Sequence, residues 1–110
     1  MSVKICGITR EADARAAVEC GASAIGFIFW PKSKRYIEPG RARQIARTLP
    51  PFVTPVGVFV NQPADDIRAI ATVVGLGAVQ LRWPFESPAH RLHDVGKGAL
   101  HVGRLTRLVL

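Results

Sequence analysis

Polar groups fall where the predicted strands end, and their types suit an anionic ligand. Cys6 and Gly7 follow a short run rich in β-branched residues, and a basic, aromatic loop at 32–36 follows a second run. Asn61 comes directly after a third run, and Gln80 lies near the end of a fourth. Parallel strands of α/β proteins bind ligands at their carboxyl ends. A thiol, a cluster of cations and two carboxamides at one edge favour an anionic, partly aromatic ligand over a hydrolytic triad.

Cys6 has two interpretations. A free cysteine most often behaves as a small buried hydrophobic residue. Its place at the exit of a strand, with Gly7 leaving space for a ligand to approach, instead fits a thiol that faces a binding site. Cys20 lies at the end of the first predicted helix, and we interpret it as a packed structural residue. We therefore expect Cys6 to be the more exposed and the more reactive thiol.

A repeated strand–helix unit positions these groups. Strands are expected at residues 2–6, 24–29, 56–60 and 78–81. Thr9 is expected to cap a helix that ends near Glu19. Pro39 lies in the first turn of the next helix, which the prolines at 50–51 stop. A third helix follows the turn after residue 60 and ends at Gly75.

Strands that alternate with helices predict an α/β fold with parallel pairing through right-handed crossovers. The strands are continuous apolar runs, which fits a sheet covered on both faces or the wall of a barrel. No strand is followed by GxGxxG or GxxxxGK[ST], so the sequence supports neither a dinucleotide site nor a P-loop. The spacing of cysteines and histidines fits no metal site.

Composition narrows the class of protein further. The chain has 110 residues with 48% hydrophobic residues, which suits one domain. It has no apolar run of 18 residues and no secretory signal at its start, and its two cysteines suit a reduced, cytoplasmic setting. The net charge is +7, but the arginines are scattered and only 32–35 is a dense basic cluster. We therefore expect neither a nucleic-acid partner nor a membrane partner.

The residues after 81 carry weaker signals. Ser87 and Pro88 resemble the start of a short helix, and a fifth strand is expected near 99–102. The three histidines lie in this part of the chain, and we assign them no role: His90, His93 and His101.

Five motifs together resemble the phosphoribosylanthranilate isomerases of tryptophan biosynthesis. In chain order they are KICGIT, GASAIGFIF, PKSKRYI, PPFVTPVGVFVNQP and GLGAVQL. The resemblance covers residues 3–81 and implies a partial (β/α)8 TIM barrel with about four βα units. It implies that residues 1–81 form the N-terminal half of the isomerase domain and that residues 82–110 are a divergent tail.

The resemblance also implies a reaction and a site. The family converts N-(5-phosphoribosyl)anthranilate to 1-(o-carboxyphenylamino)-1-deoxyribulose 5-phosphate by an Amadori rearrangement. Cys6 would be the general base, and Arg35 would hold the anthranilate carboxylate, because a guanidinium matches a carboxylate in shape and charge. Gly7, Asn61 and Gln80 would complete the substrate site. No cofactor and no metal is implied.

Two parts of the family's machinery have no counterpart in this sequence. The general-acid aspartate is absent, since Asp94 stands in the wrong context, and so are the phosphate-binding loops after strands seven and eight. We therefore expect this chain alone to be inactive. Two alternatives stay open, which are a non-catalytic half-barrel and a small basic module that binds a polyanion.

Half of a barrel would leave its first and last strands with unpaired edges. It would also leave Phe27, Phe59 and Val79, whose side chains are expected to face the barrel interior, without the opposing half. Self-association, for example as a homodimer, is therefore expected.

Overall fold

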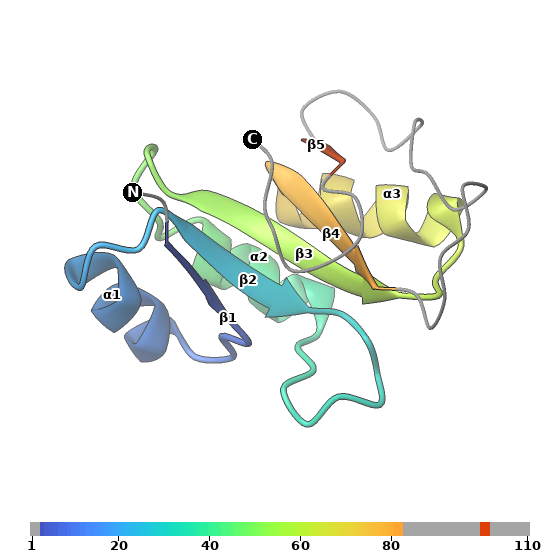
Figure 1. Cartoon of the computed structure of the whole chain (residues 1–110), viewed down its shortest axis with the longest axis horizontal. Coiled ribbons are helices and arrows are strands. Elements are labelled where there is room, and N and C mark those ends of the chain that lie inside the picture. The colour runs from blue at the N-terminus through green and yellow to red at the C-terminus, as the bar shows by residue number, and fades with distance from the viewer. Residues whose placement is uncertain (1–2, 83–99, 102–110) are drawn as a thin grey trace.

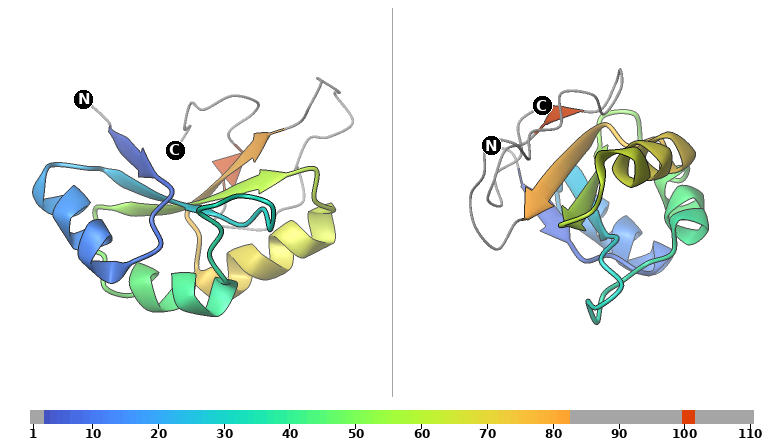
Figure 2. Two further views of the ribbon diagram at one scale, coloured as in Figure 1. Left: turned by 90° about the horizontal axis from the view of Figure 1, so that it is seen from below. Right: turned by 90° about the vertical axis from the view of Figure 1, so that its right-hand side faces the viewer.

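The computed structural model describes residues 3–82 and 100–101, which form a parallel sheet with helices beside it (Figure 1). The elements in chain order are β1 (Lys4–Cys6), α1 (Glu11–Glu19), β2 (Ala24–Ile28), α2 (Pro39–Ala46), β3 (Thr54–Val60), α3 (Ala64–Val74), β4 (Ala78–Arg82) and β5 (Leu100–His101). The strands lie in the order β1-β2-β3-β4-β5, and every neighbouring pair is parallel. Figure 2 shows the three helices on one side of the sheet. The expected α/β fold with parallel strands is confirmed.

The start of α1 differs from the expectation. The cap residue is Arg10 rather than Thr9, and its side chain makes no capping hydrogen bond. Glu11 and Asp13 instead place negative charge in the first turn, which the helix dipole favours. The Arg10 guanidinium donates to both carboxylate oxygens of Asp13, at 3.1 and 3.0 Å. These hydrogen bonds lower the pKa of the Asp13 carboxyl below its ordinary value.

Strand boundaries also differ in part. β3 begins at Thr54, two residues earlier than expected, because Thr54 and Pro55 continue the pairing with β2. β5 falls within the 99–102 stretch where a fifth strand was expected, and it contains His101. The short helix expected at Ser87 and Pro88, together with His90 and His93, lies outside the described residues.

Strand pairing divides the sheet into two faces. Cys6 pairs with Gly26, Gly26 with Val56, and Val56 with Ala78. Paired residues of parallel strands point to the same side, and successive residues alternate. The even-numbered face therefore carries Lys4, Cys6, Ala24, Gly26, Ile28, Val56, Val58, Ala78 and Gln80. The odd-numbered face carries Ile5, Ile25, Phe27, Gly57, Phe59, Val79 and Leu81.

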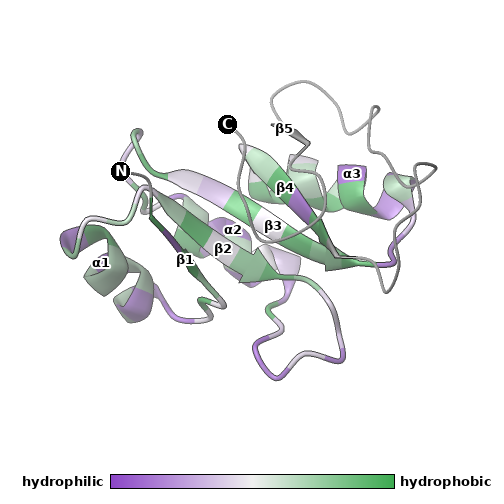
Figure 3. Ribbon diagram, in the orientation of Figure 1, coloured by the Kyte–Doolittle hydropathy of each residue, from purple (hydrophilic) through white to green (hydrophobic). Residues whose placement is uncertain are grey.

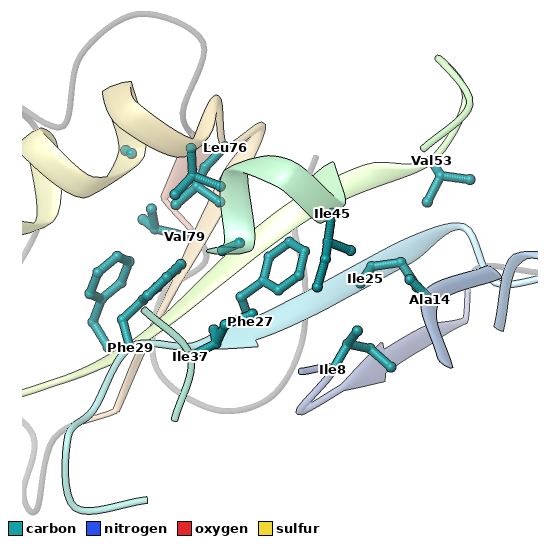
Figure 4. Packing of buried hydrophobic residues seen from close by; sticks show 14 of the residues in the cluster. Ile8, Ala14, Ile25, Phe27, Phe29, Ile37, Ile45, Val53, Leu76 and Val79 are labelled. Carbon is teal, nitrogen blue, oxygen red and sulfur yellow. The ribbon is translucent and has the colours of Figure 1, made fainter. Parts of the chain in front are cut away.

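The main core lies between the odd-numbered face and the helices (Figure 4). Phe27, Phe59 and Val79 are at most 1% exposed and belong to this core with Ile45 of α2 and Ile67 of α3. The prediction that these three side chains face a barrel interior is therefore wrong. Because the strands are apolar throughout, their sequence shows no alternation that would assign the two faces. The helices cover the face that was expected to line the barrel interior.

The helix layer stops short of the β1 edge. Ile5 pairs with Ile25 and points to the same side, yet Ile5 is 39% exposed whereas Ile25 is fully buried. Val3, just before β1, is 42% exposed. Among the described strands β1 pairs only with β2, so one side of its backbone has no strand partner there. The expected open edge is present at β1. The open edge expected at the last strand, residues 78–81, is not, because β4 pairs there with β5.

Cys20 is exposed whereas Cys6 is half-buried. The assignment of Cys20 as a packed residue and the expectation that Cys6 is the more exposed thiol are therefore both wrong. Cys20 is the C-cap of α1, beyond the residues of that helix that belong to the core, which are Ala14 and Ala17. The loop after β2 carries polar residues at its tip, whereas β2 itself is apolar (Figure 3). None of the helices in the described part of the chain has the length and apolar character needed to cross a bilayer.

Two phenylalanines test this account of the core. Phe59 stacks on Phe29 with ring centroids 5.4 Å apart, whereas Phe52 is 75% exposed. Phe59→Ala should lower the free energy of unfolding by about 3–5 kcal/mol, because it leaves a cavity in the core. Phe52→Ala should change it by less than about 0.5 kcal/mol. Urea titration followed by circular dichroism measures both, and equal losses for the two variants would contradict the assigned core.

Candidate functional site

The Cys6 thiol lies on the even-numbered face beside Gly26. Cys6 is half-buried at the end of β1, and Gly26 is its partner in β2. A Cβ atom built on Gly26 would lie only 3.1 Å from the Cys6 Sγ. The Cys6 sulfur therefore lies next to the space that a side chain at residue 26 would occupy. The sequence analysis missed Gly26, although a glycine inside a strand often marks such a close approach.

Gly7 turns the chain away from the sheet directly after Cys6. Its φ of 85° is a left-handed conformation that glycine adopts without strain. Its N–H donates to the Gly26 carbonyl at 3.0 Å, and the N–H of Ile8 donates to the same oxygen at 3.2 Å. Both residues after Cys6 are therefore hydrogen-bonded to Gly26, the residue that pairs with Cys6 in the sheet.

Arg35 occupies the space above Gly7. Its Nη1 donates to the Cys6 carbonyl at 3.2 Å, and a Cβ atom on Gly7 would lie 2.4 Å from that same nitrogen. Ile37, which is buried and whose N–H donates to the Ile28 carbonyl, anchors the loop that carries Arg35. The space that Gly7 leaves was expected to admit substrate, and here the Arg35 side chain fills it.

Gln80 lies on the same face but is held by a different residue. It is 2% exposed, and its Oε1 accepts a hydrogen bond from the Nζ of Lys4. A flat sheet would place β1 and β4 about 14 Å apart, at roughly 4.8 Å for each strand spacing. The contact therefore requires the sheet to curl toward this face, as strands do in a barrel. Small buried side chains lie on the face between them: Ala24, Val56 and Ala78.

Asn61 lies at the end of β3. It is exposed, and its φ of 52° makes it the one non-glycine residue of the described part with a left-handed backbone. Asparagine tolerates this conformation better than most residues do. The neighbouring Gln62 accepts a hydrogen bond from the Val60 N–H at 3.3 Å, which closes the turn.

The predicted site residues thus fall into two sets. Cys6, Gly7 and Arg35 are in direct contact with one another, whereas Gln80 is linked to Lys4, and Asn61 marks the end of a different strand. Their roles toward a substrate stay predictions. The described residues include no group of His, Cys, Asp and Glu side chains that could hold a metal ion. A thiol can accept a proton, and a guanidinium can bind a carboxylate.

Comparison with known proteins gives a consistent picture. The family model described as N-(5'-phosphoribosyl)anthranilate (PRA) isomerase matches residues 3–84. The chain is 60% identical over 79 residues to an N-(5'-phosphoribosyl)anthranilate isomerase of Thermotoga maritima, which covers 72% of this chain and 38% of the relative. It is 44% identical over 104 residues to the protein of the same name from Methylibium petroleiphilum, which covers 94% of this chain and 48% of the relative.

The match to the Methylibium petroleiphilum protein spans 104 residues, which is more than residues 1–81 provide, so it extends beyond residue 81. The chain nevertheless spans less than half the length of these curated relatives. The division of the chain at residue 82 stays a prediction.

Solved structures agree with the fold. A phosphoribosyl anthranilate isomerase in complex with reduced 1-(o-carboxyphenylamino)-1-deoxyribulose 5-phosphate has a TM-score of 0.75 and 55% identity, and the match covers 78% of this chain and 44% of that one. A structure of monomers generated from the dimeric enzyme of Thermotoga maritima has a TM-score of 0.73 and 51% identity, with the same coverage. The ligand belongs to the first of these proteins and the dimer to the second.

Two glycines with left-handed backbones test the contact of Arg35 with Gly7. Gly7 has Arg35 against it, whereas a Cβ atom on Gly21, with a φ of 97°, would meet nothing within 4 Å. Gly21→Ala should cost about 1–2 kcal/mol of stability for its backbone alone. Gly7→Ala should cost at least about 1 kcal/mol more, because the methyl group displaces Arg35.

Arg35→Ala provides the control for this comparison. In that background the two alanine substitutions should cost the same, as measured by urea unfolding. An excess cost of Gly7→Ala that persists without Arg35 would show that another neighbour limits the space above Gly7.

Proposed function

Since the chain belongs to the N-(5'-phosphoribosyl)anthranilate isomerase family, we propose that it supplies the general base and the carboxylate-binding group of that isomerisation. The observation that carries the proposal is the contact of the Arg35 guanidinium with the Cys6 backbone above Gly7. In this proposal Cys6 moves the proton, and Arg35, which is hydrogen-bonded to the backbone carbonyl of Cys6, binds the aromatic acid. The reaction would belong to tryptophan biosynthesis, in the cytoplasm.

Cys6 acts as the base in this proposal. After the furanose ring opens, the substrate is a Schiff base between C1 and the anthranilate nitrogen. The Cys6 thiolate takes the proton from C2, the C2–H electron pair forms a C1–C2 double bond, and the electrons of the C=N bond move to nitrogen. The resulting enol then gives the ketose. A thiol at the carboxyl end of a strand, half-buried and on the even-numbered face, suits this step.

Arg35 binds and orients the substrate in this proposal. A guanidinium has five N–H donors in a fixed plane, and the Cys6 carbonyl takes a hydrogen bond from Nη1. The other N–H groups can donate hydrogen bonds to both oxygens of the anthranilate carboxylate. Because Arg35 is fixed to the residue that carries the thiol, the carboxylate and C2 are held in a set relation to the sulfur. Asn61 and Gln80 complete the proposed substrate site, and the reaction needs no cofactor.

A chimera tests the proposal. Residues 1–84 of this chain are joined to the remainder of the Thermotoga maritima relative, and the disappearance of N-(5'-phosphoribosyl)anthranilate is followed by fluorescence. The chimera should turn over substrate, and Cys6→Ser should reduce the rate by about 10²–10⁴-fold, as expected when a general base is lost. Cys20→Ser, at the exposed thiol, is the matched control and should leave the rate unchanged.

The 110-residue chain alone should show no turnover, because the general acid and the phosphate loops are missing from it. A Cys6→Ser chimera as active as its parent would contradict the role of Cys6. Turnover by the isolated chain would contradict the need for the missing groups.

Self-association is part of the proposal for the chain by itself. The exposed Val3 and Ile5 lie at the β1 edge of the sheet, and edge strands with apolar side chains readily pair with other chains. The net charge of +7 opposes association, but salt screens it, since the Debye length is about 10 Å at 0.1 M.

Sedimentation velocity at low and moderate salt measures this association. The chain should sediment as a dimer or larger species at moderate salt, and Ile5→Lys should shift it toward monomer because a charge blocks the edge. Val73→Lys is the control, since Val73 is 45% exposed on α3, away from that edge. A compact monomer at both salt concentrations, with cooperative unfolding, would contradict the open edge.

A further inference from the structure

We infer that Gly26 is a positioning residue for the Cys6 thiol, because its missing side chain sets where the sulfur lies on the even-numbered face. The inference deepens the proposed function and rests on it for its catalytic meaning. Its geometric content stands separately, because it concerns the place of one sulfur atom and can be measured without any turnover.

Three contacts converge on Gly26. It pairs with Cys6 in the sheet, and its carbonyl accepts hydrogen bonds from the N–H groups of Gly7 and Ile8. A Cβ atom on Gly26 would lie 3.1 Å from the Cys6 Sγ, 3.2 Å from its Cα and 3.4 Å from its Cβ. The separations from the Sγ and the Cα are tighter than ordinary van der Waals contacts, and the separation from the Cβ is at their lower limit. Any side chain at residue 26 would therefore push on the sulfur.

The backbone at residue 26 gives no other reason for a glycine. The described glycines with positive φ are Gly7, Gly21 and Gly75, and Gly26 is not among them. An L-residue can adopt its extended conformation, and a glycine inside a strand costs stability. The close approach of Cys6 is therefore the reason that we assign for a glycine at residue 26.

This contact bears directly on proton transfer. A general base must reach its proton within about 2.6–3.2 Å, so a shift of the sulfur by a few tenths of an ångström matters. Arg35 is fixed to the Cys6 carbonyl and not to the sulfur. Displacing the thiol would therefore change its place relative to a carboxylate that Arg35 holds.

Alkylation of the 110-residue chain by iodoacetamide tests the inference, with each thiol located by mass spectrometry across a range of pH. In Gly26→Ala the Cys6 rate should fall by about threefold or more and its dependence on pH should change, because a methyl group covers one side of the sulfur. Cys20 is exposed at the far end of α1 and should react as before. Gly40→Ala, whose added Cβ would approach only the Glu38 side chain, at 3.7 Å, is the matched control and should alter neither thiol.

Cys6→Ala provides a second measurement if Gly26→Ala unfolds the chain. Removing the sulfur should reduce the loss of stability caused by Gly26→Ala by about half or restore folding, because coupled changes at contacting residues are not additive. An unchanged Cys6 rate and pH profile in folded Gly26→Ala would overturn the inference, as would the same loss of stability with and without the sulfur. Neither readout depends on isomerase activity, so failure of the proposed function would show separately in the chimera.

Discussion

The parallel pairing of Cys6 with Gly26 is the constraint on which the rest of the site depends. This register sets which residues of every strand share a face, because the pairing continues from Gly26 to Val56 and from Val56 to Ala78. A slip by one residue would turn the Cys6 side chain toward the helices. The core resists such a slip, because it would carry large buried side chains such as Phe27 to the other face.

The two faces of the sheet carry side chains of different sizes for a physical reason. Large side chains fill the space between the odd-numbered face and the helices, whereas a separate cluster of smaller buried side chains lies on the other face: Ala24, Val56 and Ala78. Small residues let the sheet curl toward that face, and the link between Lys4 and Gln80 spans the concave side. A curled face with a thiol at the carboxyl end of its first strand provides the setting for the chemistry.

Local signals in the sequence predicted the order of the helices and strands, but they did not predict how these elements pack against one another. Gly75 marked the end of a helix correctly, because a left-handed cap is a property of a few neighbouring residues. The strands are apolar on both faces, so no alternation along the chain could place Phe27 toward the helices. The contact of Arg35 with Cys6 joins residues 29 positions apart, and its closeness to Gly7 follows from how a loop packs. The motifs identified Cys6 and Arg35 as partners in a site, but not the role of Gly26 beside them.

The most direct test of this account is a crystal structure of the chimera with reduced 1-(o-carboxyphenylamino)-1-deoxyribulose 5-phosphate bound. The account predicts that Arg35 holds the carboxylate of the ligand while keeping its hydrogen bond to the Cys6 carbonyl, and that the Cys6 sulfur lies beside Gly26 and within van der Waals contact of C2. A ligand whose carboxylate lies away from Arg35, or a thiol that points away from C2, would contradict it.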